Sequence, residues 1–350
     1  MILSLKFFAD CIFQFSLYLS GRRMMQSNRN NFKGVFFLLK LIISVFSIWL
    51  IYCRVIEMEN SGDWFKSTGH SVLKDDLILL CIVFVLMFLN WLIEAVKWKK
   101  AMKSLESVSI AKAYKAVCSG MTVSFFTPNR TGEFAGRVFH LSKADRIEAS
   151  IATVLESFSQ LIITIVIGSL SAAYFLRSFA SLPHMLENGV IVLLLLLSLS
   201  LLFFYLNVSL LEGLYRKYRF PEKWHHYFRI FSAFSRSDLI SLLLLSGLRY
   251  LVFVIQFYLL LMIFKINLPF LVSFIFTSVT YLAMATVPTF AFTEIGIRTS
   301  VAVYFYSHVT NMSQAVVNAS FALWIINLVI PALAGALFIF NFKFVRSKPE

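Results

Sequence analysis

Residues 124–137 read SFFTPNRTGEFAGR. The stretch ends an apolar run, breaks it at Pro128, and then places two arginines, a glutamate and two glycines within ten positions. Residues 285–298, ATVPTFAFTEIGIR, follow the same scheme around Pro288. Proline interrupts a helix because it lacks an N–H donor, and glycine does so because it permits a positive φ. The two stretches therefore predict two broken helices, each carrying charge beside its break.

The composition places these motifs in a membrane protein. Of the 350 residues, 59% are hydrophobic and 14% are charged, and the mean hydropathy is +0.78. Globular domains are roughly 45–50% apolar and about 25% charged. The net charge of +14 comes from short basic loops between apolar runs, which is the pattern of the positive-inside rule, so we expect no nucleic-acid partner. The four cysteines show no C-x-x-C spacing, and we expect no metal site and no cofactor.

Six apolar stretches are long enough to cross a hydrocarbon layer of about 30 Å. Two shorter apolar stretches, 116–127 and 269–288, end in the two motifs. The basic loops place both termini in the cytoplasm and leave both flanks of each motif on the same side of the membrane. The two short stretches are therefore predicted to be re-entrant hairpins that enter from opposite faces. The six predicted spans are residues 34–53, 77–97, 150–176, 189–208, 239–265 and 316–341.

Each half of the chain then contains, in order, a span, a second span, a hairpin and a third span. Three crossings per half turn the second half upside down, which makes an inverted-topology repeat with halves at about 34–180 and 185–345. The fold class is an all-α membrane helix bundle. Pro128 and Pro288 are expected to lie close together near its middle.

The two half-repeats together form a single predicted membrane domain, residues 34–345, and the two ends of the chain lie outside it. Residues 1–33 are expected to be a cytoplasmic or interfacial segment, with residues 346–350 as a tail. The alternative for the first segment is that Met24 or Met25 is the natural start.

Charged side chains flank both helix breaks. The half-helix that follows a break points its positive dipole end at the break, which attracts anions. Glu133 and Arg137 are four residues apart, as are Glu294 and Arg298, so each pair lies on one helix face. Arginine also matches phosphate through two parallel hydrogen bonds. The predicted substrate-binding residues are Arg130, Gly132, Glu133, Arg137, Glu294, Gly296 and Arg298; the alternative is that these ions are solvated at the membrane surface.

Three further ionisable residues, Glu94, Glu156 and Arg249, fall inside predicted spans. A charge in a span is expensive, so a functional role is the first hypothesis. An ion pair that only holds helices together is the alternative. Their polar companions within the spans are Asn90, Gln160, Gln256, Asn318 and Asn327.

The first motif resembles the transmembrane region of the lysylphosphatidylglycerol synthase family, a flippase-like integral membrane domain found alone or ahead of a soluble aminoacyl-transferase domain. That family typically shows Pro-Gly-Arg-x-Gly-Glu followed by an arginine. This pattern maps onto Pro128, Arg130, Gly132, Glu133 and Arg137, with Asn129 in place of the glycine.

The second motif is similar to the family's second signature, a proline followed by a glycine-rich Gly-Val-Arg-Glu turn. It corresponds to Pro288 through Gly296-Ile297-Arg298, with Thr299 where the family has glutamate. Glu294 is a candidate to substitute for that acid.

The resemblance covers residues 34–345 and implies re-entrant elements and the movement of polar-headed lipids between leaflets. We therefore expect a flippase-like protein of the bacterial cytoplasmic (inner) membrane that binds an anionic phospholipid or a polyprenyl-linked lipid. The partners it implies are membrane lipid head groups and a separate lipid-modifying transferase.

An enzyme is the less favoured interpretation. The sequence has no G-x-S-x-G, H-E-x-x-H, P-loop or G-x-G-x-x-G motif after a strand, and the soluble transferase domain is not part of these residues. Two alternatives stay open. One is a membrane-embedded transferase that acts on a lipid-phosphate donor with Glu133 or Glu294 as base, and the other is a non-transporting membrane subunit.

Overall fold

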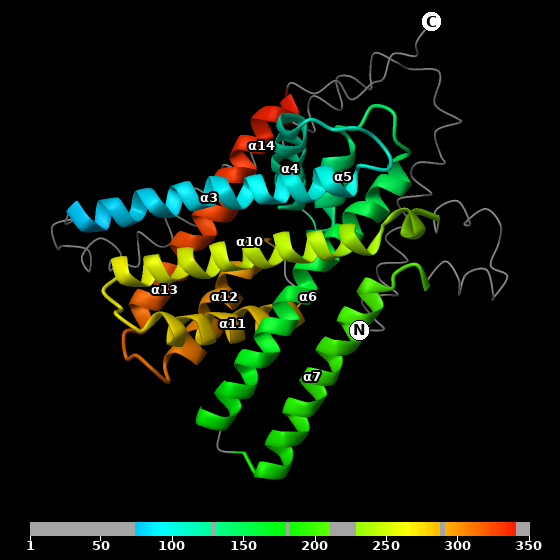
Figure 1. Cartoon of the computed structure of the whole chain (residues 1–350). Coiled ribbons are helices and arrows are strands. Elements are labelled where there is room, and N and C mark those ends of the chain that lie inside the picture. The colour runs from blue at the N-terminus through cyan, green and yellow to red at the C-terminus, as the bar shows by residue number, and fades with distance from the viewer. Residues whose placement is uncertain are drawn as a thin grey trace, which may run out of the picture. The chain divides into compact units, whose positions relative to one another are not determined.

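The computed structural model describes residues 74–125, 127, 130–179, 182–210, 229–287 and 291–340 (Figure 1). Throughout this part of the chain the regular structure is helical, with no strand. The predicted span at 34–53 and both prolines of the helix breaks, Pro128 and Pro288, lie outside the described residues.

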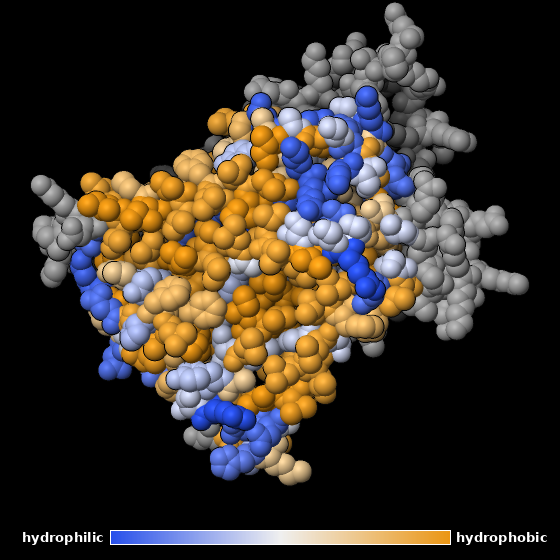
Figure 2. Space-filling model, viewed as in Figure 1, coloured by the Kyte–Doolittle hydropathy of each residue, from blue (hydrophilic) through white to orange (hydrophobic). Residues whose placement is uncertain are grey.

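Five helical segments are long and apolar enough to cross a membrane. They match five of the six predicted spans, and Figure 2 shows their apolar side chains forming a broad surface between hydrophilic ends. The chain is therefore an integral membrane protein, and the predicted all-α polytopic bundle is confirmed. The segments are α3 (Lys74–Ala101), α6 (Arg146–Phe179), α7 (His184–Leu206), α10 (Arg236–Ile263), and α13 (Ser313–Trp324) continued through a π-helical turn (Ile325–Val329) into α14 (Ile330–Phe340).

Each motif spans the break between two shorter helices that pack on each other and continues into the second of them. The first pair is α4 (Ile110–Ser124) and α5 (Gly132–Val138), and the second is α11 (Phe270–Thr286) and α12 (Ala291–Tyr306). Helix, break and returning helix are the parts that a hairpin requires. Re-entry into a membrane stays a prediction.

Local signals begin several of these helices. Ser235 and Asp238 form a capping box at the start of α10, in which each side chain accepts from the other residue's backbone N–H. Ser109 caps α4 by accepting from the backbone N–H of Lys112. Prolines, which cannot donate a backbone hydrogen bond, precede α7 and α11.

The helices α3 and α10 pack side by side and antiparallel (Figure 1). Lys265 holds Asp76 at one end of the pair with Nζ–Oδ1 of 2.9 Å. Lys100 lies 3.8 Å from Asp238 at the other end. These ion pairs are partly exposed and contribute little stability individually, but they fix which ends of the two helices meet.

The two halves exchange contacts reciprocally. The first hairpin helix of the N-terminal half, α4, packs on α14, and its counterpart in the C-terminal half, α11, packs on α6. The second hairpin helices, α5 and α12, pack on α6 and α13 of their own halves. An inverted repeat predicts this pairing, because a contact between the first hairpin and the last span of the other half must occur twice.

Two glycines show that the reciprocity extends to single residues. Gly168 is as far along the chain from the first residue of α6 as Gly335 is from the first residue of α13. A Cβ on Gly168 would lie 2.6 Å from the Cβ of Leu282 and 3.2 Å from the carbonyl oxygen of Ser278. A Cβ on Gly335 would collide with the Cys118 carbonyl and lie 2.5 Å from Thr122 Oγ1.

The contacted residues are equivalent as well. Cys118 holds the same position in α4 as Ser278 holds in α11, counted from the first residue of each helix. Thr122 and Leu282 correspond in the same way, one helical turn further on. The contact between α6 and α11 therefore uses the same helix positions as the contact between α14 and α4. This equivalence supports the inverted repeat from packing alone.

Adding a methyl group at one of these crossings should destabilise the protein. Gly335→Ala forces α14 away from the α4 backbone, and overpacking of this kind costs about 1–3 kcal/mol. The measurement is the midpoint of thermal unfolding of the purified protein in detergent micelles.

Gly247→Ala in α10 is the matched control, because a Cβ there meets nothing within 4 Å. The control should leave the midpoint unchanged or raise it slightly, since alanine favours helix over glycine. Equal midpoints for the two variants would contradict the close α4–α14 contact.

Candidate functional site

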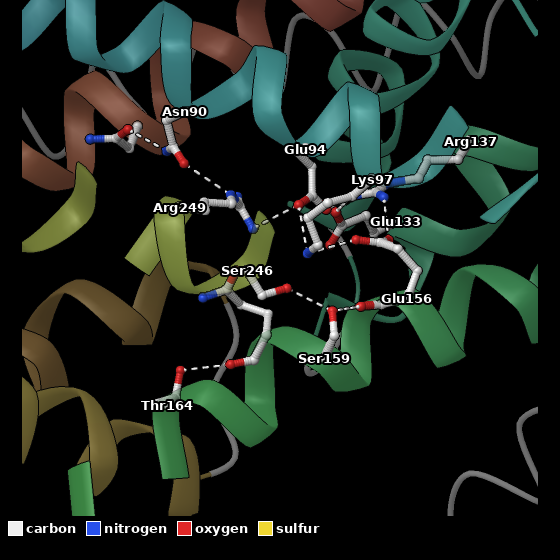
Figure 3. Close-up of polar contacts among 12 residues, drawn as sticks. Asn90, Glu94, Lys97, Glu133, Arg137, Glu156, Ser159, Thr164, Ser246 and Arg249 are labelled. Carbon is white, nitrogen blue, oxygen red and sulfur yellow. Dashed lines mark hydrogen bonds and ion pairs between the residues drawn. The ribbon is translucent and has the colours of Figure 1, made fainter. Parts of the chain in front are cut away.

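A buried ion network surrounds Arg137, as Figure 3 shows. The Arg137 side chain on α5 is 0% exposed. Its Nη1 donates to Glu156 on α6 at 3.0 Å, its Nη2 donates to Glu94 on α3 at 2.6 Å, and it also pairs with Glu133 one turn back on α5. The short helix α5 is thus fastened to both of its long neighbours by a single guanidinium.

Two more cations complete this network. Lys97, fully buried one turn after Glu94, lies 2.7 Å from Glu156 and 3.2 Å from Glu94. Arg249 on α10 reaches Glu94 at 3.0 Å. Three carboxylates therefore face three cations, and the set is neutral as a whole. We call these six residues the Arg137 network: Glu94, Lys97, Glu133, Arg137, Glu156 and Arg249.

A polar chain leads from the Arg137 network to the last span. Arg249 Nε donates to Asn90 Oδ1 at 2.9 Å, and Asn90 Nδ2 donates to Asn327 Oδ1 at 3.0 Å. Asn327 lies in the π-helical turn, a feature that often marks functional sites. The predicted polar companions Asn90 and Asn327 are therefore brought together with Arg249.

A second ion cluster joins the two sequence motifs. Glu294 on α12 accepts from Arg130 of the first motif through Oε2 at 2.6 Å and from Arg298 of its own motif through Oε1 at 2.6 Å. Arg130 and Glu294 are 164 residues apart in sequence. We call Arg130, Glu294 and Arg298 the Glu294 bridge.

The two clusters differ in exposure and in charge. The side chains of Arg130 and Arg298 are 35% and 20% exposed, whereas Arg137 is completely enclosed. One carboxylate, that of Glu294, serves two arginines in the bridge. The Glu294 bridge therefore carries one positive charge more than its acid neutralises and can be reached from outside.

Arg130 holds an uncommon backbone conformation. Its φ is +57°, in the left-handed region that non-glycine residues seldom adopt. Such a conformation costs about 1–2 kcal/mol and is concentrated at functional sites. The ion pair with Glu294 helps to keep the side chain in place at the break.

The two predicted glycines have different surroundings. The space beside Gly132 is filled, because a Cβ there would lie 2.8 Å from Thr127, whose Oγ1 also accepts the Gly132 N–H. The space beside Gly296 is open, with nothing within 4 Å of a Cβ. Close backbone approach by a ligand is thus possible at Gly296, and Gly132 serves the turn into α5.

The remaining polar companions lie elsewhere. Gln256 donates to the Val83 carbonyl at 3.0 Å, Asn318 accepts from Gln314 at 3.2 Å, and the Gln160 carbonyl accepts from Thr164 at 2.9 Å. None of these three bonds reaches either ion cluster. Within the described residues, no group of three or more His, Cys, Asp or Glu side chains could hold a metal ion.

Sequence reasoning missed Lys97. It stands in the basic stretch Lys97-Trp98-Lys99-Lys100, which is typical of a cytoplasmic flank. Its spacing of three from Glu94 was the available signal, because residues three apart share a helix face. Only the packing of α6 supplies the second carboxylate, Glu156, that makes its burial possible.

The helix bundle and the two charged breaks that meet at Glu294 define a class of polytopic integral membrane protein. Residues 37–339 match the protein family described as the lysylphosphatidylglycerol synthase TM region, and the chain belongs to that family. No curated protein and no solved structure matches the chain.

A carboxylate clamp outside the spans holds the loop between α5 and α6. Glu106, in the loop after α3, accepts from three successive backbone N–H groups, Ser142 at 2.8 Å, Lys143 at 2.6 Å and Ala144 at 3.1 Å, and from Lys112 Nζ at 2.9 Å. Burial would raise the pKa of this carboxyl group, but the hydrogen bonds outweigh it and lower the pKa to about 2.

Acid should release this clamp. Because the folded-state pKa of Glu106 lies below the ordinary value of 4.5, its contribution to stability is complete above that value and is lost as the pH falls toward about 2. Glu106→Gln should therefore lower the thermal unfolding midpoint near neutral pH, and its deficit relative to the unmodified protein should shrink in acid. A deficit that stays constant with pH would contradict the ionised clamp.

Removing the central cation should destabilise the Arg137 network strongly. Arg137→Ala leaves three carboxylates, two of them buried, with two cations, and breaking a buried ion pair in this way costs about 3–5 kcal/mol. A second change, Glu156→Gln, restores neutrality and should recover part of the loss. Thermal unfolding of the two single variants and the double variant gives the coupling, and additive effects would contradict the network.

Proposed function

We propose that this protein binds an anionic membrane lipid and translocates its head group between leaflets, with the Glu294 bridge as the phosphate site. The observation that carries the proposal is the sharing of Glu294 by Arg130 and Arg298. Two partly exposed arginines with one acid between them leave one positive charge for a ligand. Membership of a lipid-handling family agrees with this assignment.

The proposed binding step is an exchange of ion partners. Glu294 neutralises part of the charge of both arginines. An incoming phosphate accepts hydrogen bonds from Arg130 and Arg298, and arginine is suited to do this with two parallel bonds. Glu294 then gives up one or both arginines. Binding therefore replaces a contact inside the protein by a contact to the lipid.

The same exchange would link binding to movement. Arg130 belongs to the break between α4 and α5, and Glu294 belongs to α12 in the other half. The ion pair between them fastens the two hairpins, so a lipid that replaces it changes how strongly the halves are held together. Movement of one repeat against the other around a central site is how many inverted-repeat transporters alternate access.

The Arg137 network has a different part in this proposal. Its cations are matched by its acids and Arg137 is enclosed, so it serves as the fixed support that holds α5 and the first break. Binding of phosphate by Arg137 itself stays a prediction. The transferase alternative is disfavoured by the geometry, because both candidate bases, Glu133 and Glu294, are held by arginines.

The proposal also includes the membrane in which the protein lies. The host membrane would be the bacterial cytoplasmic (inner) membrane with both termini in the cytoplasm, as the loop charges predict. The proposed partners are membrane lipid head groups and a separate lipid-modifying transferase that would supply the modified lipid.

Loss of a bridge arginine should weaken lipid binding. Arg130→Ala and Arg298→Ala should each reduce the affinity for phosphatidylglycerol by about tenfold or more, because each removes charged hydrogen bonds to phosphate. Affinity is measured with purified protein in lipid nanodiscs of neutral lipid titrated with phosphatidylglycerol, and leaflet movement with a fluorescent analogue in liposomes. Glu294→Gln should raise the affinity for phosphatidylglycerol, since it removes the acid that competes with the phosphate for the two arginines.

Arg177→Ala is the matched control. This arginine lies in the last turn of α6, is 67% exposed, and lies 3.7 Å from Glu187, which is not part of the bridge. Its removal should leave affinity and leaflet movement unchanged. Normal binding and leaflet movement in both bridge-arginine variants, with the fold intact, would refute the proposed site.

A further inference from the structure

The last span of each half connects the two hairpins. In the first half, α6 packs on α5 of its own hairpin and on α11 of the other hairpin. In the second half the same connection is divided between two helices, because α13 packs on α12 and α14 packs on α4. A change in the angle between α13 and α14 therefore changes how the two hairpins lie relative to each other.

The two last spans differ in their middle. The span α6 is one continuous α-helix from Arg146 to Phe179. The other span is interrupted, because the π-helical turn Ile325–Val329 separates α13 from α14, and Pro331 follows as the second residue of α14. We call residues 325–331 the joint. It lies between the part of the span that packs on α12 and the part that packs on α4.

Pro331 accounts for the interruption. Proline has no N–H to donate, and its ring clashes with the carbonyl group one turn earlier, which here belongs to Asn327. A π-helical adjustment relieves such a clash in a membrane helix, and helices bend sharply at these places. The residues of α6 that are equally far from its start are Gln160 and Thr164. Thr164 Oγ1 donates to the Gln160 carbonyl at 2.9 Å, and α6 continues without a break.

The joint separates the two partners of the Glu294 bridge. Directly after the joint, the Ala332 carbonyl of α14 accepts from Thr122 Oγ1 on α4 at 2.6 Å. Movement of α14 therefore carries α4, which leads into the break that holds Arg130. Before the joint, α13 packs on α12, which carries Glu294.

A buried hydrogen bond ties the joint to the Arg137 network. Asn327 Oδ1 accepts from Asn90 Nδ2 at 3.0 Å, and Asn90 Oδ1 accepts from Arg249 Nε at 2.9 Å (Figure 3). Arg249 in turn pairs with Glu94 at 3.0 Å. Asn90 is 0% exposed and Asn327 is 6% exposed, so water competes little for these bonds. The angle at the joint is thus held from α3 and α10.

We propose that the joint is a hinge that controls the Glu294 bridge, and that the Asn90–Asn327 hydrogen bond is its latch. The inference rests on the proposed function and deepens it, because it assigns the regulation of the same site. Bending at the joint moves α14 and α4 relative to α13 and α12, and this separates Arg130 from Glu294. The continuous helix α6 keeps α5 and α11 in place, so the last span is the part that moves.

The first test gives the last span the residue that α6 has. Pro331→Thr restores the N–H and supplies the hydroxyl that Thr164 provides in α6, so it favours a continuous helix. Movement of a fluorescent phosphatidylglycerol analogue between liposome leaflets should fall by about tenfold or more, because the hinge step is slowed. Affinity for phosphatidylglycerol should change by less than about twofold, and the unfolding midpoint should stay or rise, since a backbone hydrogen bond is gained.

Pro183→Thr is the matched control, because Pro183 is exposed and precedes α7. It should leave leaflet movement, affinity and the unfolding midpoint unchanged. Pro331→Ala also restores the N–H, and it keeps the question decidable if threonine prevents folding. Normal leaflet movement in a folded Pro331 variant would overturn the hinge.

The second test follows the hinge directly. Spin labels at two exposed positions, Lys115 on α4 and Tyr304 on α12, report the distance between the hairpins by double electron–electron resonance, with the four native cysteines replaced by alanine. Asn327→Leu keeps the side-chain size and removes the latch, so it should shift the distance distribution without added lipid. Phosphatidylglycerol should shift the distribution of the labelled protein and should not shift that of Pro331→Thr.

Asn318→Leu is the control for the latch. Asn318 is a buried asparagine of α13 whose Oδ1 accepts from Gln314 on the same helix at 3.2 Å. Its removal should leave the distance distribution unshifted. An unshifted distribution in a folded Asn327→Leu, or an equal shift in Asn318→Leu, would overturn the latch.

The hinge and the proposed function fail in different ways. If Arg130→Ala and Arg298→Ala abolish lipid binding while Pro331→Thr moves lipid normally, only the hinge fails. If both arginine variants bind and move lipid normally while Pro331→Thr slows leaflet movement and Asn327→Leu shifts the label distance, only the proposed phosphate site fails.

Discussion

The need to neutralise charge inside an apolar helix bundle governs the arrangement of this protein. An ion taken out of water costs several kcal/mol unless a counter-ion and hydrogen bonds meet it. Arg137 meets that requirement by contacting carboxylates from three helices, and those contacts set how α3, α5 and α6 approach one another. The hairpin that carries the first break is therefore held by electrostatics as much as by packing.

Close packing at two glycines also determines how the helices approach one another. Gly168 and Gly335 let the last span of each half touch the hairpin of the other, so each hairpin is enclosed by elements from both halves. The charges are not repeated in the same way. The first half closes its arginine in a neutral network, and the second leaves Arg298 beside a pocket and shares Glu294 with Arg130. The two halves therefore differ in chemistry, because one encloses its arginine completely and the other leaves Arg298 partly exposed.

Much of the architecture could be predicted from residue order. Apolar length identified the five spans that the structure describes. Pro128 and Pro288 lie outside the described residues, but the helices before them end at Ser124 and Thr286 and the helices after them begin at Gly132 and Ala291. The glutamate and arginine of each motif pair as their spacing of four predicts. The role of Lys97 could not be predicted in this way, because a lysine in a basic flank is ordinarily solvated, and its second partner is distant in sequence.

The sequence by itself determined the membrane class, the family and the residues at the two breaks, because these depend on apolar length, composition and spacing along one chain. Tertiary structure alone decided which charges meet. It brought Arg130 to Glu294 across 164 residues, and it separated an enclosed arginine, Arg137, from two partly exposed ones. The physical reason is that neutralisation in a low-dielectric interior acts between neighbours in space, and neighbours in space are set by how helices pack.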